Sequence, residues 1–431
     1  MKDKVSNVSL MQDTSCPVEK VSVFGLGYIG LPTAAMFASR RIEVVGIDVN
    51  PEVVEHINNG EIHIIEPDLD IVVRATVSQG YLRASLEPEP AEVFLVAVPT
   101  PFKGNNHDPD LTYIESACKS IAPLLQPGNL VILESTCPVG TTDRMVSWLK
   151  SARPDLTFPD TLGKESDIRI AHCPERVLPG KVMQELISND RVIGGMTEKC
   201  SAFAVSLYKT FVTGDCVVTS ARTAEMAKLT ENSFRDTNIA FANELSMICD
   251  RLGIDVWEVI SLANRHPRVN ILRPGPGVGG HCIAVDPWFI VASAPEESKI
   301  IRSARQVNDS KPDWVLQKVD ATVKQFLSQY PKLDSEDVTI ACYGLTFKPD
   351  IDDLRESPAL EIVTTLSHRH DGKLLVVEPN IDALPANVVR TDLVSIATAF
   401  QQADIHIYLV AHREFKEFPK PPRFVIDTVG I

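Results

Sequence analysis

The sequence predicts an α/β fold with two doubly wound domains, which a central helical connector with a long helix joins. Three observations support this prediction. A short β-type run leads into a glycine-rich turn and a helix near the start of the chain, residues 219–252 contain no Gly or Pro, and strand patterns return after residue 330. At 431 residues the chain exceeds what one hydrophobic core usually supports, so we expect several domains.

Composition and charge limit the class of protein. Hydrophobic residues make up 44% of the chain and charged residues 23%, which is ordinary for a globular protein. The formal net charge of −15 argues against a general nucleic-acid or anionic-membrane surface. Residues 1–20 lack the apolar run of a signal peptide, and no later segment approaches about eighteen uninterrupted apolar residues. We therefore expect a flexible tail over 1–20, a cytoplasmic location, no membrane insertion and no nucleic-acid partner.

The nine cysteines are an odd number and include neither a CxxC pair nor a metal-ligand spacing. This usage fits a reducing cytosol and gives no reason to expect a metal site. Most of these cysteines are expected to be small buried hydrophobic residues. A cysteine therefore needs local support before it is treated as reactive.

A dinucleotide-binding fingerprint follows the first predicted strand, residues 21–24. Its glycines permit a tight turn, the approach of a pyrophosphate to the backbone and close helix packing, with the phosphate at the helix N-terminus. The contacts predicted for this turn are Gly25, Gly27, Tyr28, Ile29 and Gly30. A second predicted strand, 43–47, ends at Asp48, whose carboxylate can accept hydrogen bonds from both ribose hydroxyls. A lone GxGxxG is weak, but strand, glycines, helix, strand and acid in order predict NAD rather than NADP.

Two further apolar strands, 93–98 and 130–135, each end in a turn that carries hydroxyl groups. Ligands bind at such carboxyl ends of parallel strands. Thr100 and Thr136 are therefore candidates for contact with the nicotinamide half of the cofactor. Thr142 is a weaker candidate for cofactor contact. Thr141 and Thr142 are at least as well explained as caps of the helix that follows.

Residues 219–252 predict one long helix. At 100° per residue, one arc of its surface gathers four polar residues, Glu225, Lys228, Asn232 and Arg235. Solvent exposure would be the ordinary explanation of such a stripe. The rest of the helix is largely apolar, which predicts a central connector that packs against several partners and supports a dimer.

A loop rich in Gly and Pro, residues 273–280, precedes Cys282. Such a loop can bring backbone N–H groups close to an anion or a reacting carbonyl, and an adjacent imidazole or lysine favours the thiolate. A thiolate is useful in the oxidation of an alcohol to an acid, because an aldehyde has no second hydride to give until a nucleophile has added. Addition gives a thiohemiacetal, a second oxidation gives a thioester, and water releases the acid. Cys282 is the candidate nucleophile.

Strand patterns at 338–344, 373–380 and 405–410 predict a second Rossmann-like doubly wound domain. Only Gly344 remains of a dinucleotide fingerprint there, so another nucleotide group is the expected ligand. Phe347, Lys348 and Arg355 lie in the loop between the first two strands, where the cations can meet a phosphate or a carboxylate. Exposed ion pairs with neighbouring Asp residues are an equally good interpretation of these cations from the residues alone.

Six ordered motifs resemble the UDP-glucose/GDP-mannose dehydrogenase family over nearly all of residues 21–431. They are GLGYIGLPTA, STCPVG, CPERVLPG, AEMAKLTENSFR, GGHCIAVDP and GLTFKPDIDDLRESP. NRHPRVNIL and GPGVGGHCIAVDPWF are similar to the members that oxidise UDP-N-acetyl-D-mannosamine. The sequence departs from many relatives at Cys137, where they have Ser, and we assign this thiol no catalytic role.

The resemblance implies a role for each matching residue. Cys282 would be the nucleophile and Lys228 an acid/base, with Glu175, Asn232, Asp286 and Thr136 around the reacting carbon. The substrate site would be formed by Arg176, Val177, Lys228, Asn232, Arg235, His266, Arg268, Gly279, Phe347 and Lys348. Arg355 would lie near the cofactor.

The resemblance also implies a reaction and an organisation. We expect NAD-dependent four-electron oxidation at C6 of UDP-N-acetyl-D-mannosamine, by a homodimer, for a bacterial surface polysaccharide such as enterobacterial common antigen. UDP-GlcNAc, UDP-glucose and GDP-mannose are alternative substrates, and a non-catalytic NAD sensor is a remote alternative. After the tail, the expected domains are a Rossmann-like NAD-binding domain (21–218), a central helical domain (219–330) and a nucleotide-sugar domain (331–431).

Overall fold

The computed structural model describes residues 18–104, 107–178, 180–280, 282–421 and 424–431. The chain divides into two compact units, Met1–Lys228 and Leu229–Ile431, and each is described by itself. The predicted tail lies outside the described residues except for 18–20, and the first strand already includes Lys20. Within the part that is described, no helix is both long and apolar enough to cross a membrane.

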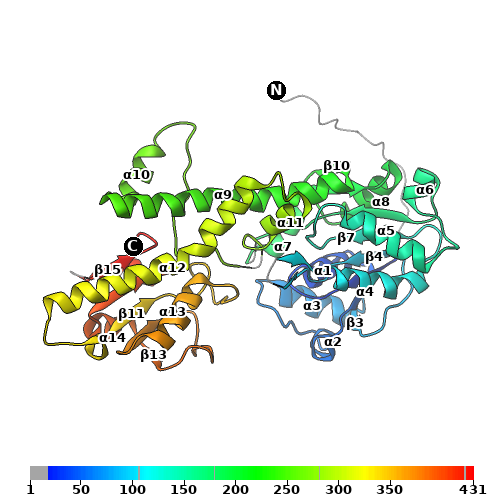
Figure 1. Ribbon diagram of the computed structural model, residues 1–431. Coiled ribbons are helices and arrows are strands. Elements are labelled where there is room, and N and C mark those ends of the chain that lie inside the picture. The colour runs from blue at the N-terminus through cyan, green and yellow to red at the C-terminus, as the bar shows by residue number, and fades with distance from the viewer. Residues whose placement is uncertain (1–17, 105–106, 179, 281, 422–423) are drawn as a thin grey trace. The chain divides into compact units, whose positions relative to one another are not determined.

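An eight-stranded sheet forms the centre of the first unit (Figure 1), with the strand order β10-β9-β8-β7-β4-β1-β2-β3. Its strands are β1 (Lys20–Phe24), β2 (Glu43–Ile47), β3 (Leu82–Ser85), β4 (Val93–Val96), β7 (Leu130–Leu133), β8 (Arg169–His172), β9 (Arg191–Gly195) and β10 (Cys216–Ser220). Neighbouring strands are parallel except for β8 and β9, which are antiparallel. A short antiparallel pair, β5 (Phe102–Lys103) and β6 (Asp108–Pro109), lies outside this sheet.

Helices cover both faces of this sheet because its central strands are apolar on both sides. One hydrophobic cluster joins alternate strand residues such as Val21 and Val44 to α1 and α3, and a second joins Val45 and Phe94 to α4 and α5. The helices of the unit are α1 (Gly30–Ser39), α2 (Pro51–Asn58), α3 (Leu69–Ser78), α4 (Thr112–Ile121), α5 (Thr141–Ala152), α6 (Pro159–Leu162), α7 (Val182–Ser188) and α8 (Glu198–Tyr208). The predicted doubly wound fold is confirmed.

The long helix α9 (Ala221–Leu252) confirms the predicted helical connector, and the boundary between the units falls within it. In the second unit it packs with α12 (Lys299–Gln329), where Arg305 donates a buried hydrogen bond to Asp236 at 2.6 Å. Two shorter helices lie between them in the sequence, α10 (Val256–Ala263) and α11 (Asp286–Ser293). The apolar part of α9, which we expected to pack against several partners, includes two exposed aromatic residues, Phe234 and Phe241.

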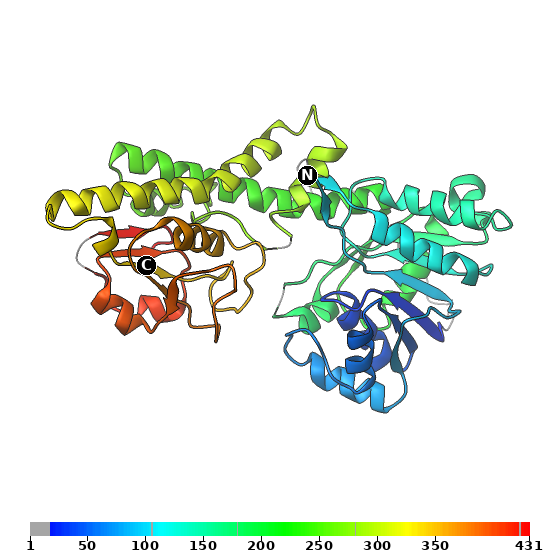
Figure 2. The same ribbon diagram turned by 60° about the horizontal axis from the view of Figure 1, so that its bottom comes forward.

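A five-stranded parallel sheet completes the second unit, with the order β13-β12-β11-β14-β15. Figure 2 shows α12 beside this sheet, and a shared hydrophobic cluster joins the helix to α13 and the strands. The strands are β11 (Ile340–Tyr343), β12 (Leu374–Val377), β13 (Thr391–Leu393), β14 (Ile405–Tyr408) and β15 (Val425–Asp427). The helices that follow α12 are α13 (Pro358–Arg369), α14 (Ile396–Gln402) and α15 (Arg413–Lys416).

Candidate active site

The turn between β1 and α1 has the backbone geometry that a dinucleotide requires. Gly25 has a φ of +88°, and a Cβ atom there would lie 2.7 Å from the carbonyl oxygen of Ala97. A Cβ atom at Gly30 would lie 1.8 Å from the carbonyl oxygen of Gly25, whereas one at Gly27 would meet nothing within 4 Å. The turn is therefore closed on the protein side and open at Gly27, which leaves room for a pyrophosphate at the N-terminus of α1.

Asp48 lies at the end of β2 and beside this turn. Its carboxylate accepts hydrogen bonds from the backbone N–H groups of Leu26 and Asn50, both at 3.0 Å. These bonds fix the carboxylate, and its oxygens retain lone pairs for two ribose hydroxyls. Together with the half-exposed Tyr28, this arrangement fits an adenosine diphosphate group.

The turns that follow β4 and β7 are joined to each other. The Thr100 hydroxyl donates to the carbonyl oxygen of Thr136 at 2.6 Å, and the Ser135 hydroxyl donates to that of Val98 at 2.7 Å. Two residues that lie far apart in the sequence, Thr100 and Thr136, are thus brought together at the carboxyl edge of the sheet, as expected from the strand order.

The expectation that Thr141 or Thr142 caps α5 is wrong. The N-cap residue is Gly140, and no side chain at that position makes a cap hydrogen bond. Thr141 donates its hydroxyl to Pro138, and Thr142 donates its hydroxyl to the carboxylate of Glu225. Glu225 also accepts from the backbone N–H groups at the start of α5, so a residue of α9 supplies the cap.

Glu175 belongs to a buried cluster of charges. Arg191 donates to Glu175 and to Glu134, both at 2.5 Å, and its guanidinium lies 4.1 Å from the centre of the Tyr208 ring. Burial raises the pKa of Glu134 to about 7, although the charge of Arg191 opposes this shift. Two carboxylates therefore share one guanidinium in a site that excludes water. Arg176 and Val177, which follow Glu175, are partly buried.

Within the second unit, α9 and α11 meet at two of the predicted catalytic residues. The Asn232 amide donates to the Asp286 carboxylate at 2.5 Å, and both side chains are buried. Cys282 is exposed, and its carbonyl oxygen accepts hydrogen bonds from Val285 and Asp286. Cys282 therefore lies one helical turn before the start of α11. His281, the adjacent imidazole, lies outside the described residues, and Arg235 is exposed on α9.

The glycine-rich loop packs against the segment that precedes α13. A Cβ atom at Gly279 would lie 2.3 Å from the carbonyl oxygen of Glu356, and one at Gly280 would lie 2.9 Å from the Phe347 ring. Only glycine fits at this approach, and Gly280 also has a φ of +84°. The structure thus places Gly279 and Phe347, two predicted substrate residues, at one junction.

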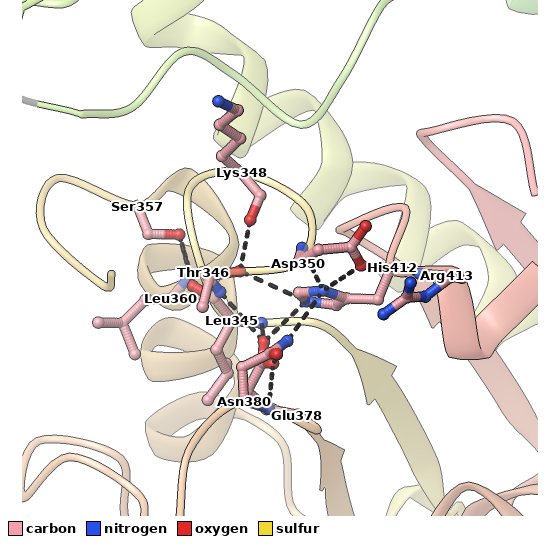
Figure 3. A network of polar contacts seen from close by, with 10 residues as sticks. All are labelled: Leu345, Thr346, Lys348, Asp350, Ser357, Leu360, Glu378, Asn380, His412 and Arg413. Carbon is pink, nitrogen blue, oxygen red and sulfur yellow. Dashed lines mark hydrogen bonds and ion pairs between the residues drawn. The ribbon is translucent and has the colours of Figure 1, made fainter. Parts of the chain in front are cut away.

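Lys348 extends from a turn that a buried polar network holds (Figure 3). Glu378 accepts hydrogen bonds from the backbone N–H of Leu345 at 2.7 Å and pairs with His412 at 3.0 Å. Thr346 donates its hydroxyl to the carbonyl oxygen of Lys348. The Lys348 ammonium points away from the network in Figure 3, so the network fixes the backbone of the turn without using this cation.

Three predicted residues have different surroundings. Arg355 pairs with Asp353 through its Nε and a terminal nitrogen, which is the local ion pair that the sequence also allowed. His266 and Arg268 are exposed after α10, and the His266 ring accepts from the Arg268 backbone at 3.3 Å. Neither the ion pair of Arg355 nor the exposed position of His266 and Arg268 adds to the case for a ligand.

Sequence reasoning missed the residues that hold the site rather than line it. Arg191, Glu134, Glu378 and His412 carry no local motif, and their partners are distant in sequence. Glu225 was visible as a member of the polar stripe of α9, but nothing in that pattern indicated a helix cap.

Comparisons with known proteins agree with this architecture. Three domain models of the UDP-glucose/GDP-mannose dehydrogenase family match the chain: the NAD binding domain at residues 19–212, the central domain at 222–310 and the UDP binding domain at 341–431. The UDP-N-acetyl-D-mannosamine dehydrogenase of Yersinia pestis is 61% identical over 96% of this chain and 99% of its own length.

Two further relatives extend the comparison. The NDP-N-acetyl-D-galactosaminuronic acid dehydrogenase of Ralstonia nicotianae is 60% identical over 95% of this chain and 96% of its own. The solved structure of a UDP-D-ManNAc dehydrogenase from Pyrococcus horikoshii has a TM-score of 0.82 and 38% identity, and 95% of each chain is covered. The chain therefore belongs to the UDP-glucose/GDP-mannose dehydrogenase family and is an NAD-dependent oxidoreductase with a UDP-binding domain.

Proposed function

We propose that this enzyme oxidises UDP-N-acetyl-D-mannosamine at C6 to UDP-N-acetyl-D-mannosaminuronate. The observation that carries the proposal is the exposed Cys282 thiol, one turn before the buried Asn232–Asp286 pair. The names of the relatives from Yersinia pestis and Pyrococcus horikoshii support the sugar. NAD, when bound, accepts one hydride in each of two oxidations, so one sugar consumes two NAD and one water.

Cys282 is proposed as the group that makes the second oxidation possible. Its thiolate adds to C6 of the aldehyde and forms a C–S bond, and the carbonyl oxygen takes up a proton. The thiohemiacetal then loses a hydride and a proton to become a thioester. Water breaks the C–S bond, which releases the carboxylate and regenerates the thiol. Lys228 is proposed to move the protons, while Asn232 and Asp286 hold the oxygen atoms and the water at C6.

The first unit is proposed to bind the cofactor and to supply part of the catalytic machinery. The cofactor-binding residues proposed are Gly25, Gly27, Tyr28, Ile29, Gly30, Asp48, Thr100, Thr142 and Arg355. The Thr142 hydroxyl already donates to Glu225, so we assign Thr142 to the cofactor site through its position in the turn. Glu175 and Thr136 are proposed to act near the reacting carbon.

A set of residues is proposed for binding of the sugar nucleotide. They are Arg176, Val177, Lys228, Asn232, Arg235, His266, Arg268, Gly279, Phe347 and Lys348. The packing of Gly279 against the segment that holds Phe347 supports this set within the second unit. Lys348 supplies a positive charge suited to a diphosphate.

A second substrate is favoured by one observation. The Ralstonia nicotianae relative, whose name refers to NDP-N-acetyl-D-galactosaminuronic acid, is nearly as similar to this chain as the Yersinia pestis enzyme. Both names share a nucleotide-linked N-acetylhexosamine. An acetamido sugar is therefore a firmer proposal than the configuration at its ring carbons, and UDP-GlcNAc, UDP-glucose and GDP-mannose remain the comparison substrates.

We also propose a cytoplasmic homodimer. Phe234, Phe241 and Ile248 repeat at seven-residue spacing on α9 and are 69%, 58% and 47% exposed, so they form one apolar face. A second copy of the chain is the partner that we propose for this face.

We further propose the domain boundaries 21–218, 219–330 and 331–431. We also propose a role in bacterial surface polysaccharide assembly of the enterobacterial common antigen type.

The test is to incubate the purified enzyme with NAD and one nucleotide sugar at a time. UDP-N-acetyl-D-mannosamine, UDP-N-acetylgalactosamine, UDP-GlcNAc, UDP-glucose and GDP-mannose form the panel. We expect the highest kcat/KM with the mannosamine, two NADH per sugar and the uronate as product. Turnover of none of the five would refute the enzyme assignment, and one NADH with accumulation of aldehyde would refute the thioester route.

A further inference from the structure

Glu225 is a buried carboxylate on α9 for which the proposed reaction has no role. The residue is only 1% exposed. It accepts hydrogen bonds from the backbone N–H of Gly140 at 2.6 Å, the backbone N–H of Thr142 at 2.8 Å and the Thr142 hydroxyl at 2.6 Å. We infer that Glu225 is a positioning residue that fixes the turn 136–142 onto the helix carrying Lys228. This inference rests on the proposed function.

The start of α5 needs a carboxylate from elsewhere because it has no cap of its own. Gly140 occupies the N-cap position with a φ of +93° and has no side chain to offer. The Thr141 hydroxyl is bound to Pro138. The first amides of a helix otherwise lack partners, and the positive end of the helix dipole favours an anion there. Glu225 satisfies both requirements from a distant part of the chain.

The surroundings of Glu225 make α5 its electrostatic partner. Acceptor or ligand atoms of Cys137, His172 and Glu225 lie within 4.8 Å of one another in this buried region. Burial lowers the pKa of His172 to about 3, so its ring is neutral at physiological pH and does not balance the carboxylate. Burial also raises the pKa of Glu225, while the hydrogen bonds from Thr142 and Gly140 oppose that shift. The three hydrogen bonds at the start of α5 are therefore the interactions that favour the ionised form of Glu225.

The turn is held on two sides. Thr100 binds the carbonyl oxygen of Thr136, and Glu225 binds the amides of Gly140 and Thr142. Lys228 follows Glu225 by one helical turn. The Glu225 carboxylate thus sets the position along α9 at which the turn 136–142 contacts the helix. It thereby sets the distance from Thr136 to Lys228. A misplacement of roughly 1 Å in such a site can lower kcat about 100-fold.

Glu225→Gln is the informative variant, because it preserves size while placing an amide donor against the N–H groups of α5. Asp167→Asn is its matched control. Asp167 is partly buried and accepts from the Thr157 backbone at 2.9 Å and the Thr157 hydroxyl at 2.6 Å, so it makes the same two kinds of hydrogen bond in the same unit. Asp167 precedes β8, at the amino edge of the sheet, whereas the turn follows β7 at the carboxyl edge.

The experiment measures Tm, then kcat and both KM values well below the thermal transition, with the sugar that the wild type oxidises. We expect Glu225→Gln to lower kcat at least about tenfold and to change either KM less than about threefold. Asp167→Asn should lower Tm and keep kcat within about twofold of wild type.

Two results would overturn the inference: a wild-type kcat for Glu225→Gln, or an equal loss of kcat in Asp167→Asn. If Glu225→Gln does not fold, Glu225→Asp, which keeps the charge but draws the carboxylate back by one methylene from the N–H groups of α5, decides by the same measurements. A wild type that oxidises no nucleotide sugar would count against the proposed function, whereas an active wild type with a fully active Glu225→Gln counts only against this inference.

Discussion

The Asn232 side chain donates a hydrogen bond to the Asp286 carboxylate at 2.5 Å, across 54 positions of sequence. Both residues are buried, Asn232 in the middle of α9 and Asp286 at the first position of α11. The bond fixes the start of α11, and Cys282 lies one turn before it. A polar pair in a buried site is costly to break, since the partner left behind loses its hydrogen bond.

Replacing either member of this pair should lower kcat. Replacing both should add only a small further loss. We expect Asn232→Ala and Asp286→Ala each to reduce kcat about 100-fold, because residues that act as a unit are not additive. The double variant should fall no more than about tenfold further. Stopped-flow NADH formation provides the measurement, and a double variant whose loss equals the product of the single losses would show that the two residues act independently.

Glu134 should make stability depend on pH. Its folded pKa of about 7 lies above its ordinary value of 4.5, because burial and the charge of Glu175 raise the pKa by more than the charge of Arg191 lowers it. The native state therefore retains a proton that the unfolded state releases, so this group's contribution is present below pH 4.5 and is lost as pH rises to about 7. We expect Glu134→Gln to remove this loss and to be more stable than wild type at pH 8 by about 1–3 kcal/mol.

Calorimetry at pH 5 and pH 8 checks this prediction, and Arg191→Met is its counterpart. That variant leaves two buried carboxylates without a cation and should lose about 3–5 kcal/mol. A Glu134→Gln protein that is less stable than wild type at pH 8 would mean that the Arg191–Glu134 pair stabilises the fold in its ionised form.

Glu378→Gln should weaken binding of the sugar nucleotide while leaving the chemical step intact. Burial works to raise the pKa of Glu378, but hydrogen bonds from His412 and Leu345 lower it below its usual value, so the group is ionised at neutral pH. Loss of this charge loosens the turn that carries Phe347 and Lys348. We expect KM for the sugar nucleotide to rise about tenfold, with kcat changed less than about threefold.

Asp404→Asn is the control for that measurement. Asp404 accepts a hydrogen bond from Thr339 ahead of β11, at the opposite edge of the same sheet from the turn. Its substitution should leave KM for the sugar nucleotide within about twofold of wild type. An equal rise of KM in both variants would attribute the effect to general loosening of the unit.

Local patterns predicted much of the fold because they encode local structure. The order of β1, the glycine turn, α1, β2 and Asp48 is fixed by neighbours in sequence, and so is the long helix α9. The predicted strands 93–98 and 130–135 end earlier, at Val96 and Leu133. The backbone N–H groups of Glu134 and Ser135 both donate to the carbonyl oxygen of Val96, so the regular pairing of the two strands stops there.

The supporting residues could not be found in this way. Glu225 binds Thr142 across 83 positions, and Arg191 binds Glu134 across 57, so only the folded chain brings these side chains together. A polar residue in an amphipathic pattern is ambiguous between solvent and a buried partner. The sequence therefore indicated candidate chemistry at Cys282 but not the carboxylates that hold the surrounding turns.

The most direct test of Cys282 as the nucleophile is single-turnover analysis of Cys282→Ser with excess NAD and the sugar nucleotide that the wild type oxidises. NADH, aldehyde and uronate are measured together. We predict two NADH and one uronate per sugar for the wild type, and at most one NADH with no uronate for Cys282→Ser. Uronate formation by Cys282→Ser at the wild-type rate would contradict the proposed mechanism.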